Sequence, residues 1–371
     1  MICEDCRALG MDGERLRGLE GLIARGAEEG LYPAAVYRVL RHGQVAAEGA
    51  FGWAQPEAAT PIAATLETIF DMASLTKPIT ATLLLQAVER GRVHLGMTVA
   101  YLLPEAKEAP VGPVTLRQLA THTGGLPAWK PLYKTTAPSA LEDILTTPLE
   151  SEPGTRYVYS DLGYILLGEI LARLHGAPLD RLAQEQIFAP LGMTRTAYCP
   201  DASLHPETAA TANCSWREGR ILVGEVHDAN AHSLGGVAGH AGLFSTAPDM
   251  ARFARALLNA PPDLPPILHS RARRLAAENQ IAPAIGGHSI GWFTPPNGML
   301  PYADLLSSRT FGHTGFTGTL LMLDPETDLI LILLTNRVYQ PGEGTGVLRL
   351  RRLFANLVGG AIADVASENE T

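Results

Sequence analysis

The 371-residue sequence predicts a mixed α+β fold, in which one antiparallel β-sheet is flanked by N- and C-terminal helices and a mainly α-helical subdomain is inserted. The stretch between the two ends of the chain consists of helical patterns joined by loops that contain Pro and Gly. Strands from distant segments that share one sheet require the helical part to be inserted between them. Short runs with strand character occur near both ends, at 34–40, 45–53, 289–293, 319–323 and 329–334.

The N-terminal elements follow from residue periodicity. Apolar residues recur on one helical face over 14–30, between Asp12, a suitable N-cap, and Gly30, a suitable end. A helix is therefore expected before the sheet. His42 and Gly43 separate the first two strands and are expected to form the turn of a hairpin.

The middle of the chain is expected to be mainly helical. A final strand pair is joined by a turn at 324–327, and a helix over about 347–363 closes the chain. The whole chain is interpreted as a single catalytic domain, with an α/β part at about 10–73 and 285–365 and a helical subdomain at about 74–284. Helical patterns occur at 80–90, 115–121, 139–146, 161–175 and 179–188.

Composition and charge restrict the possible partners. With 46% hydrophobic and 18% charged residues the chain is globular, and its net charge of −9 disfavours nucleic acid or anionic membranes. The densest basic stretches, 271–274 and 349–352, are interpreted as solvated helix faces. The acidic N-terminus lacks an export signal, and the longest apolar run, 329–334, is far shorter than the roughly 20 residues that span a bilayer. We expect a cytoplasmic protein without a membrane span.

Cysteine usage gives no support for a metal site or a redox centre. Cys3 and Cys6 have C-x-x-C spacing, but no second close pair follows to complete a zinc site. Disulfides are not expected in a reducing compartment, so these residues are interpreted as free thiols. No metal or cofactor is predicted.

The segment that begins at Ser74 and ends at Lys77 is an S-x-x-K motif at the start of a predicted helix. Positions three apart on a first helical turn face the same side, so the Lys77 ammonium can reach the Ser74 hydroxyl. A serine hydroxyl is a weak nucleophile unless a neighbouring group takes its proton. Backbone N–H groups at a helix N-terminus also favour developing negative charge. Ser74 is therefore the predicted nucleophile of a serine hydrolase.

Two further motifs accompany Ser74, and with them the chain resembles the serine β-lactamase and penicillin-binding-protein superfamily, especially class C β-lactamases and family VIII carboxylesterases. The motifs are Tyr159-Ser160-Asp161 and His313-Thr314-Gly315. The resemblance covers nearly the whole chain and implies a β-lactamase/transpeptidase-like fold. It also includes the segments 114–127, 153–155, 190–194 and 242–246, followed by Asp249.

The resemblance implies a role for each matching position. Ser74 is acylated, Lys77 helps to deprotonate it, and Tyr159 acts with Lys77 as base and then as acid. A tyrosine has an ordinary pKa near 10, so the nearby ammonium is what makes it useful near neutral pH. The family's oxyanion hole maps to the backbone N–H groups of Ser74 and Phe316.

The chain departs from the class C pattern at two positions that bear on substrate. Asp161 stands where those enzymes carry Asn, and an ionised carboxylate is expected to pair with Lys77. His313 stands where they carry Lys, and a mostly neutral histidine is a weaker anchor for a substrate carboxylate. His313 and Asp161 therefore favour neutral or small acyl substrates, esters first and amides second. Thr314, Gly315 and Phe316 are further candidate substrate-binding residues.

A second cluster combines His227, His232 and His240 with several glycines. Their spacing does not match a helical zinc pair, and the glycines favour a loop along the rim of the site. His240 is expected either to contact the substrate or to order this loop. The width of the pocket is expected to depend on loops around Trp129, Tyr133 and Trp292.

We expect a carboxylesterase-type hydrolase of small esters with weak or no β-lactamase activity. The alternatives are a D-amino-acid amidase or peptidase, or a β-lactamase, because all of them share the acyl-enzyme. A non-catalytic binding protein that retains the fold is a third hypothesis. The expected partner is a small-molecule ester or amide; the natural substrate and the oligomeric state are not predicted.

Overall fold

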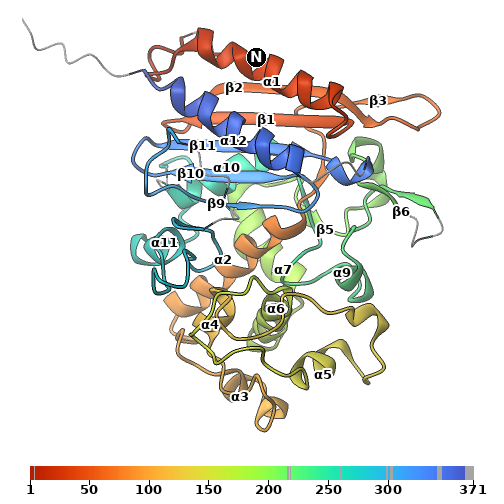
Figure 1. The fold of residues 1–371 in the computed structure, drawn as a ribbon, viewed down its shortest axis with the longest axis vertical. Coiled ribbons are helices and arrows are strands. Elements are labelled where there is room, and N and C mark those ends of the chain that lie inside the picture. Colours follow the sequence, from red (N-terminus) through yellow and green to blue (C-terminus); the bar gives the residue numbers. More distant parts are fainter. Residues whose placement is uncertain are drawn as a thin grey trace, which may run out of the picture.

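The computed structural model describes residues 1–3, 5–214, 217, 219–258, 261–297, 300, 304–340 and 345–363. Among these residues, a six-stranded antiparallel sheet has the order β3-β2-β1-β11-β10-β9, so the first and last strands of the chain pair at its centre (Figure 1). This confirms the predicted fold class. The strands are β1 (Ala34–Arg41), β2 (Gln44–Gln55), β3 (Ile62–Ala63), β9 (Phe311–Thr314), β10 (Leu320–Asp324) and β11 (Leu329–Thr335).

Helices cover both faces of this sheet. On one face α1 (Gly13–Glu28) and α12 (Thr345–Gly360) pack together, and Leu16 and Phe354 share a core with Tyr37, Leu331 and Leu333 of the sheet (Figure 1). On the other face α10 (Ala247–Leu258) packs against β1, β10 and β11. Successive side chains of a strand point to opposite faces, so an almost continuously apolar strand such as β11 is buried on both sides.

The helical part lies at one edge of the sheet and shares the second core, which contains α10 (Figure 1). Its division from the α/β part at about residues 73 and 285 stays a prediction. The longer helices at its centre are α2 (Thr76–Glu89) and α6 (Asp161–His175). Around them lie α3 (Val99–Leu102), α4 (Leu116–Ala120), α5 (Ala140–Leu145), α7 (Leu179–Ala183), α8 (Ala189–Leu191), α9 (Ala229–Ser233) and α11 (Ser270–Ala277).

Short elements connect these parts. A π-helical turn follows α7 at Gln184–Phe188. Two small sheets have the strand orders β4-β8-β5 and β6-β7, built from β4 (Phe70–Asp71), β5 (Ala197–Tyr198), β6 (Ala212–Cys214), β7 (Arg220–Leu222) and β8 (Leu243–Ser245). The 3₁₀ turns are Ala73–Leu75, Pro104–Ala106, Leu132–Lys134, Ala202–Glu207 and Arg337–Tyr339.

The N-terminal predictions are confirmed in detail. The Asp12 carboxylate caps α1 by accepting hydrogen bonds from the backbone N–H groups of Glu14 and Arg15. His42 and Gly43 form the hairpin turn between β1 and β2, both with positive φ.

The strand predicted at 289–293 is wrong. Only isolated bridges join His288 to Phe293 and Phe293 to Gly312. Gly291 has a φ of +94° and the Ser289 N–H bonds to the Trp292 carbonyl, so the segment turns back on itself. A residue run with strand propensity cannot stay extended through a glycine in this conformation.

The prediction of free thiols at Cys3 and Cys6 is also wrong in this structure. The two residues form a disulfide with Cα atoms 5.3 Å apart. The turns that follow residue 4 bring the sulfur atoms together, a local geometry that the compartment argument does not consider.

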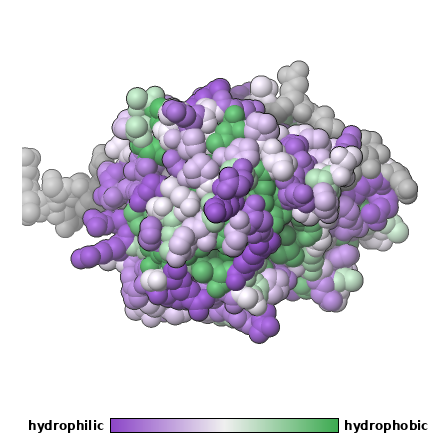
Figure 2. Space-filling model, turned by 90° about the horizontal axis from the view of Figure 1, so that it is seen from below, coloured by the Kyte–Doolittle hydropathy of each residue, from purple (hydrophilic) through white to green (hydrophobic). Residues whose placement is uncertain are grey.

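The described residues contain no helix long and apolar enough to cross a membrane. Figure 2 shows that hydrophilic residues dominate one face of the molecule, with a smaller hydrophobic area near its middle.

Candidate active site

Ser74 lies at the junction of the 3₁₀ turn Ala73–Leu75 and α2, in a cavity of about 1190 Å³. Ala73 has a positive φ of 46°, a strained conformation for a residue with a side chain. The Asp71 carboxylate holds this turn by accepting the Ala73 N–H at 2.8 Å. Burial raises the pKa of Asp71 to about 6, although hydrogen bonds from the backbone N–H groups of His227 and Ala73 act in the opposite direction. The Asp71 carboxylate therefore stabilises the turn that carries Ser74, the predicted nucleophile.

Lys77 is fully buried, and its ammonium is held by three acceptors. Nζ donates to Ser74 Oγ at 2.8 Å and to the carbonyl of His240 at 3.2 Å, and it lies 2.8 Å from Asp161 Oδ1. The pairing of Lys77 with Asp161 that the sequence predicts is therefore present. Positions 74 and 77 lie on one side of the first helical turn, as the S-x-x-K spacing requires.

Tyr159 completes the group around Lys77, whose Nζ lies 4.8 Å from the centroid of the tyrosine ring. Burial first, and the Asp161 charge second, hold the pKa of Tyr159 well above its ordinary value, and its hydrogen bond with Ser74 offsets this only in part. Tyr159 is therefore a hydroxyl at neutral pH, and its role as base and then acid stays a prediction.

His122, which belongs to none of the three motifs, packs against this group. Its Nδ1 accepts the N–H of Ser160 at 2.9 Å, and its ring lies 4.4 Å from that of Tyr159. Burial, and then the His288 charge, hold the pKa of His122 well below its usual value, so it remains neutral. The only sequence signal was its position within the family-like segment 114–127.

Residues 314–316, at and after the third motif, line the cavity, whereas the side chain of His313 is buried in the interior. Thr314, Gly315 and Phe316 line the cavity at the end of β9, the edge strand of the sheet. His313 is fully buried, and its ring stacks on that of Phe293 at 4.3 Å. Burial, and then the Lys77 charge, hold the pKa of His313 well below its usual value. A neutral, buried His313 does not serve as a cation for the substrate.

Gly315 is required by sterics, since a Cβ there would meet Thr319 Oγ1 at 2.0 Å. The Phe316 N–H donates to no hydrogen bond among the described residues. That is compatible with its predicted place in the oxyanion hole, which stays a prediction.

Two arginines at the cavity have no motif that would have revealed them. Arg351 lies in the stretch interpreted as a solvated face, but it is buried and donates to the carbonyls of Gly315 and Thr319 at 2.8 and 2.7 Å. Burial lowers the pKa of Arg351 to about 9, so it stays charged at neutral pH. That part of the surface interpretation is wrong, because α12 packs on the sheet through this position. The Arg337 guanidinium lies 4.5 Å above the Phe316 ring.

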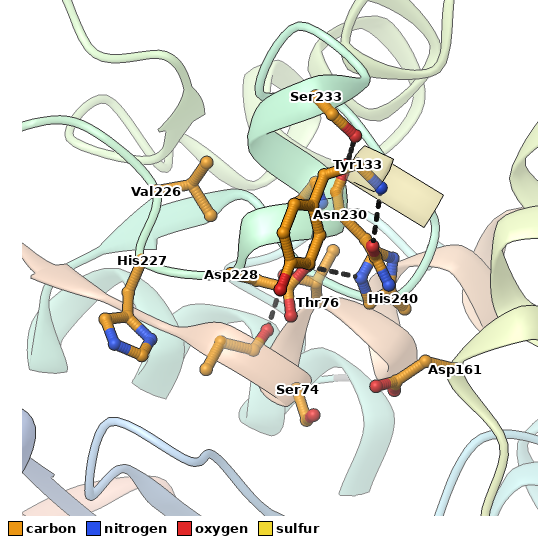
Figure 3. A network of polar contacts seen from close by, with 12 residues as sticks. Ser74, Thr76, Tyr133, Asp161, Val226, His227, Asp228, Asn230, Ser233 and His240 are labelled. Atoms are coloured by element: carbon orange, nitrogen blue, oxygen red, sulfur yellow. Dashed lines mark hydrogen bonds and ion pairs between the residues drawn. The ribbon is translucent and has the colours of Figure 1, made fainter. Parts of the chain in front are cut away.

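Asp228 and His240 form a pair on the same cavity. His240 Nε2 lies 2.8 Å from Asp228 Oδ1, which also accepts the Ala231 N–H as the cap of α9. Figure 3 shows this network above Ser74, with Asp161 beside it. Burial alone would raise the pKa of Asp228, but the hydrogen bonds from His240 and the Ala231 N–H, together with the nearby charge of Lys77, hold it well below its ordinary value.

The described residues bring Asp161, Asp228 and His240 together, with one ligand-type atom of each within 4.8 Å of the others. The histidine set considered from the sequence is not one group, since neither His227 nor His232 belongs to this cluster. Lys77 already supplies a cation at Asp161, so no metal is needed to balance it.

The aromatic residues expected near the pocket divide into two groups. Trp129 and Tyr133 line the cavity and are 48% and 40% exposed. Trp292 is fully buried and stacks on Phe253, so it belongs to the core. Trp292 therefore does not set the width of the pocket.

Comparisons with known proteins show what the chain as a whole resembles. The family model described as Beta-lactamase matches residues 19–356. A protein of Escherichia coli strain K12 named "Putative D-alanyl-D-alanine carboxypeptidase" is 33% identical, over 90% of this chain and 84% of its own length. The solved structure of EstCE1, "a hydrolase with promiscuous acyltransferase activity", has a TM-score of 0.74 at 21% identity, covering 92% of this chain and 98% of that one. A class C beta-lactamase from Rhodobacter sphaeroides has a TM-score of 0.72 at 21% identity, with the same coverage.

Proposed function

The chain belongs to the beta-lactamase family of serine hydrolases, and from this premise we propose that it is a carboxypeptidase that removes a C-terminal D-residue from a small peptide through an acyl-enzyme on Ser74. The proposal revises the preference for esters that the sequence suggested. It is supported by the carboxypeptidase names of relatives that share a third of their residues with this chain.

The proposed reaction uses the group around Lys77. Ser74 Oγ bonds to the peptide carbonyl carbon while its proton enters the network of Lys77 and Tyr159. The carbon–nitrogen bond then breaks, and the leaving nitrogen takes a proton from the same network. Water attacks the resulting ester, releases the acid and restores the Ser74 hydroxyl.

Arg337 carries the preference for a peptide that ends in a carboxylate. The sequence argument against such substrates was that His313 is a poor anchor, and the buried neutral ring supports that part of it. Arg337 lines the cavity beside Phe316 and offers a guanidinium there instead. Its Nε donates to the Phe316 carbonyl, which fixes the side chain over the ring. A guanidinium binds carboxylates with paired N–H donors.

Hydrolysis of small neutral esters is the second candidate. The exposed rings of Trp129, Tyr133 and Phe316 give the cavity apolar surface that an uncharged acyl or alcohol group can cover. The shared acyl-enzyme allows both activities, so relative rates decide between them.

The test is a kinetic panel on the purified full chain. D-alanine release from a peptide ending in D-alanyl-D-alanine is compared with hydrolysis of p-nitrophenyl acetate and nitrocefin, with Ser74→Ala as the control. We expect the peptide to have the largest kcat/KM and every activity to vanish in the control. Rapid ester hydrolysis without D-alanine release would establish the second candidate. Absence of a fluorophosphonate adduct on Ser74 would overturn both.

A cytoplasmic location also stays a prediction.

A further inference from the structure

The cluster of Asp161, Asp228 and His240 faces the cavity next to the nucleophile. All three residues line the cavity that contains Ser74. The Asp228 side chain is 26% exposed, whereas that of His240 is 1% exposed. A carboxylate therefore opens to the cavity, with a buried imidazole behind it.

The charges of this cluster do not balance. Lys77 pairs with Asp161 at 2.8 Å, and within the described part of the chain Asp228 has only His240 as a salt-bridge partner. Asp228 remains an anion at all ordinary pH values, because its pKa lies well below the usual range. The cavity thus holds one negative charge that no lysine or arginine neutralises by direct contact.

His240 contributes an acceptor that also lacks a partner. The ionised Asp228 carboxylate can only accept a hydrogen bond, so His240 donates to it through Nε2–H. When the ring is neutral, Nδ1 therefore carries no proton and presents a lone pair. Nδ1 is buried and has no hydrogen-bond partner among the described residues. A buried acceptor without a partner has lost its hydrogen bonds to water, so a ligand with N–H donors would be stabilised here.

We propose that Asp228, together with Asp161 and His240, binds the α-ammonium of the substrate's acyl residue. The preferred substrate is then a D-dipeptide or D-amino-acid amide with a free amino group, and not an N-acylated peptide. This inference rests on the proposed function and narrows its substrate class.

The size of the cluster allows one ammonium group to reach it. Tetrahedral N–H donors that reach acceptors at about 2.9 Å can span acceptors up to about 4.7 Å apart. One ligand-type atom of each of the three residues lies no more than 4.8 Å from the other two. Lys77 links them to the reaction, because the same ammonium contacts Ser74, Asp161 and the His240 carbonyl.

The carboxylate of the substrate would bind at another part of the cavity, beside Arg337. The Phe316 ring stacks on His227 at 5.9 Å and carries Arg337 above it. In the view of Figure 3, Ser74 lies between His227 and Asp161. Arg337 and the cluster of Asp161, Asp228 and His240 line the same cavity as Ser74, so a dipeptide bound across Ser74 can place its carboxylate near Arg337 and its ammonium at the cluster.

The experiment measures binding without turnover. In the full-length Ser74→Ala protein, calorimetry at pH 7 compares D-alanyl-D-alanine with N-acetyl-D-alanyl-D-alanine. We expect at least a tenfold tighter Kd for the free amine, and we expect this preference to disappear in Ser74→Ala/Asp228→Asn. The asparagine keeps an oxygen that can cap α9.

Asp328→Asn is the matched control, because Asp328 forms a comparable pair with His42 at 3.3 Å on a distant hairpin turn. It should retain the full preference. Equal affinities for the two dipeptides, or a preference that survives Asp228→Asn, would overturn the proposal. So would stoichiometric Zn²⁺ binding that depends on Asp228 and excludes the free amine.

The experiments can reject the ammonium subsite and the proposed peptidase activity independently of each other. A free-amine preference without D-alanine release by the wild-type protein would retain the subsite and reject the peptidase. Release of D-alanine from both dipeptides at equal kcat/KM, with equal affinities, would retain the peptidase and reject the subsite.

Discussion

Lys77 Nζ lies 2.8 Å from Asp161 Oδ1, and the lysine side chain is fully buried while the aspartate is 19% exposed. The same ammonium donates to Ser74 Oγ, so the carboxylate orients the group that contacts the nucleophile. Asp161 also lies at the start of α6, where backbone N–H groups favour an anion. The pair thus joins helices α2 and α6 beside Ser74.

Asp161→Asn should change the pH dependence of the reaction. Asp161 is the second cause, after burial, of the raised pKa of Tyr159, so the substitution should lower that pKa. We expect the alkaline limb of kcat/KM for p-nitrophenyl acetate to move to lower pH. Profiles from pH 6 to 11 check this. Asp143→Asn is the control, because Asp143 pairs with Lys130 outside the cavity lining, and it should leave the pH profile unchanged. A shift of the alkaline limb to higher pH in Asp161→Asn would contradict the effect assigned to Asp161.

Arg337→Ala should weaken recognition of the peptide carboxylate without affecting neutral esters. A charge-assisted hydrogen bond contributes about 1.5–3 kcal/mol, which corresponds to an increase in KM of roughly 10- to 150-fold for a dipeptide. We expect kcat/KM for p-nitrophenyl acetate to stay within about twofold. Arg255→Ala is a matched control, since Arg255 pairs with Asp263 outside the cavity lining. An unchanged dipeptide KM would exclude Arg337 as the anchor.

Gly239→Ala should destabilise the wall that carries His240. A Cβ at this position would lie 2.0 Å from the Tyr164 carbonyl, which belongs to the backbone of α6 and cannot move alone. We expect a loss of about 3 kcal/mol in the free energy of unfolding, measured in urea. Gly21 in α1 has nothing within 4 Å of an added Cβ, so Gly21→Ala should instead stabilise by about 0.5–1 kcal/mol. Equal stability of the two variants would refute the steric argument.

The sequence predicted those elements whose information is local. The N-terminal helix followed from its apolar face and Asp12, and the hairpin followed from two strands around His42 and Gly43. The Ser74–Lys77 contact followed from the geometry of one helical turn, and its pairing with Asp161 followed from charge.

The features that the sequence did not reveal depend on contacts between distant segments. Arg351 has the pattern of a surface residue, yet the packing of α12 on the sheet directs it to Gly315. Arg337 reaches the cavity only because β11 ends beside the loop after β9. No local periodicity encodes either placement, because each requires the register of the assembled sheet.

The preference for a free amine should depend on pH, because only the protonated amine of the dipeptide carries the charge that the subsite recognises. Asp228 is already ionised at acidic pH: burial raises its pKa, but the hydrogen bonds from His240 and the Ala231 N–H, together with nearby positive charge, more than offset this. Lys77 and His240 are the ionisable groups that face it. Above about pH 8 the dipeptide amine loses its proton, so the preference should fall there. Calorimetry in Ser74→Ala should therefore give a ratio of the two affinities that declines above about pH 8. A ratio that keeps rising beyond pH 9 would show that the cluster recognises the neutral amine, and the electrostatic basis of the subsite would then be wrong.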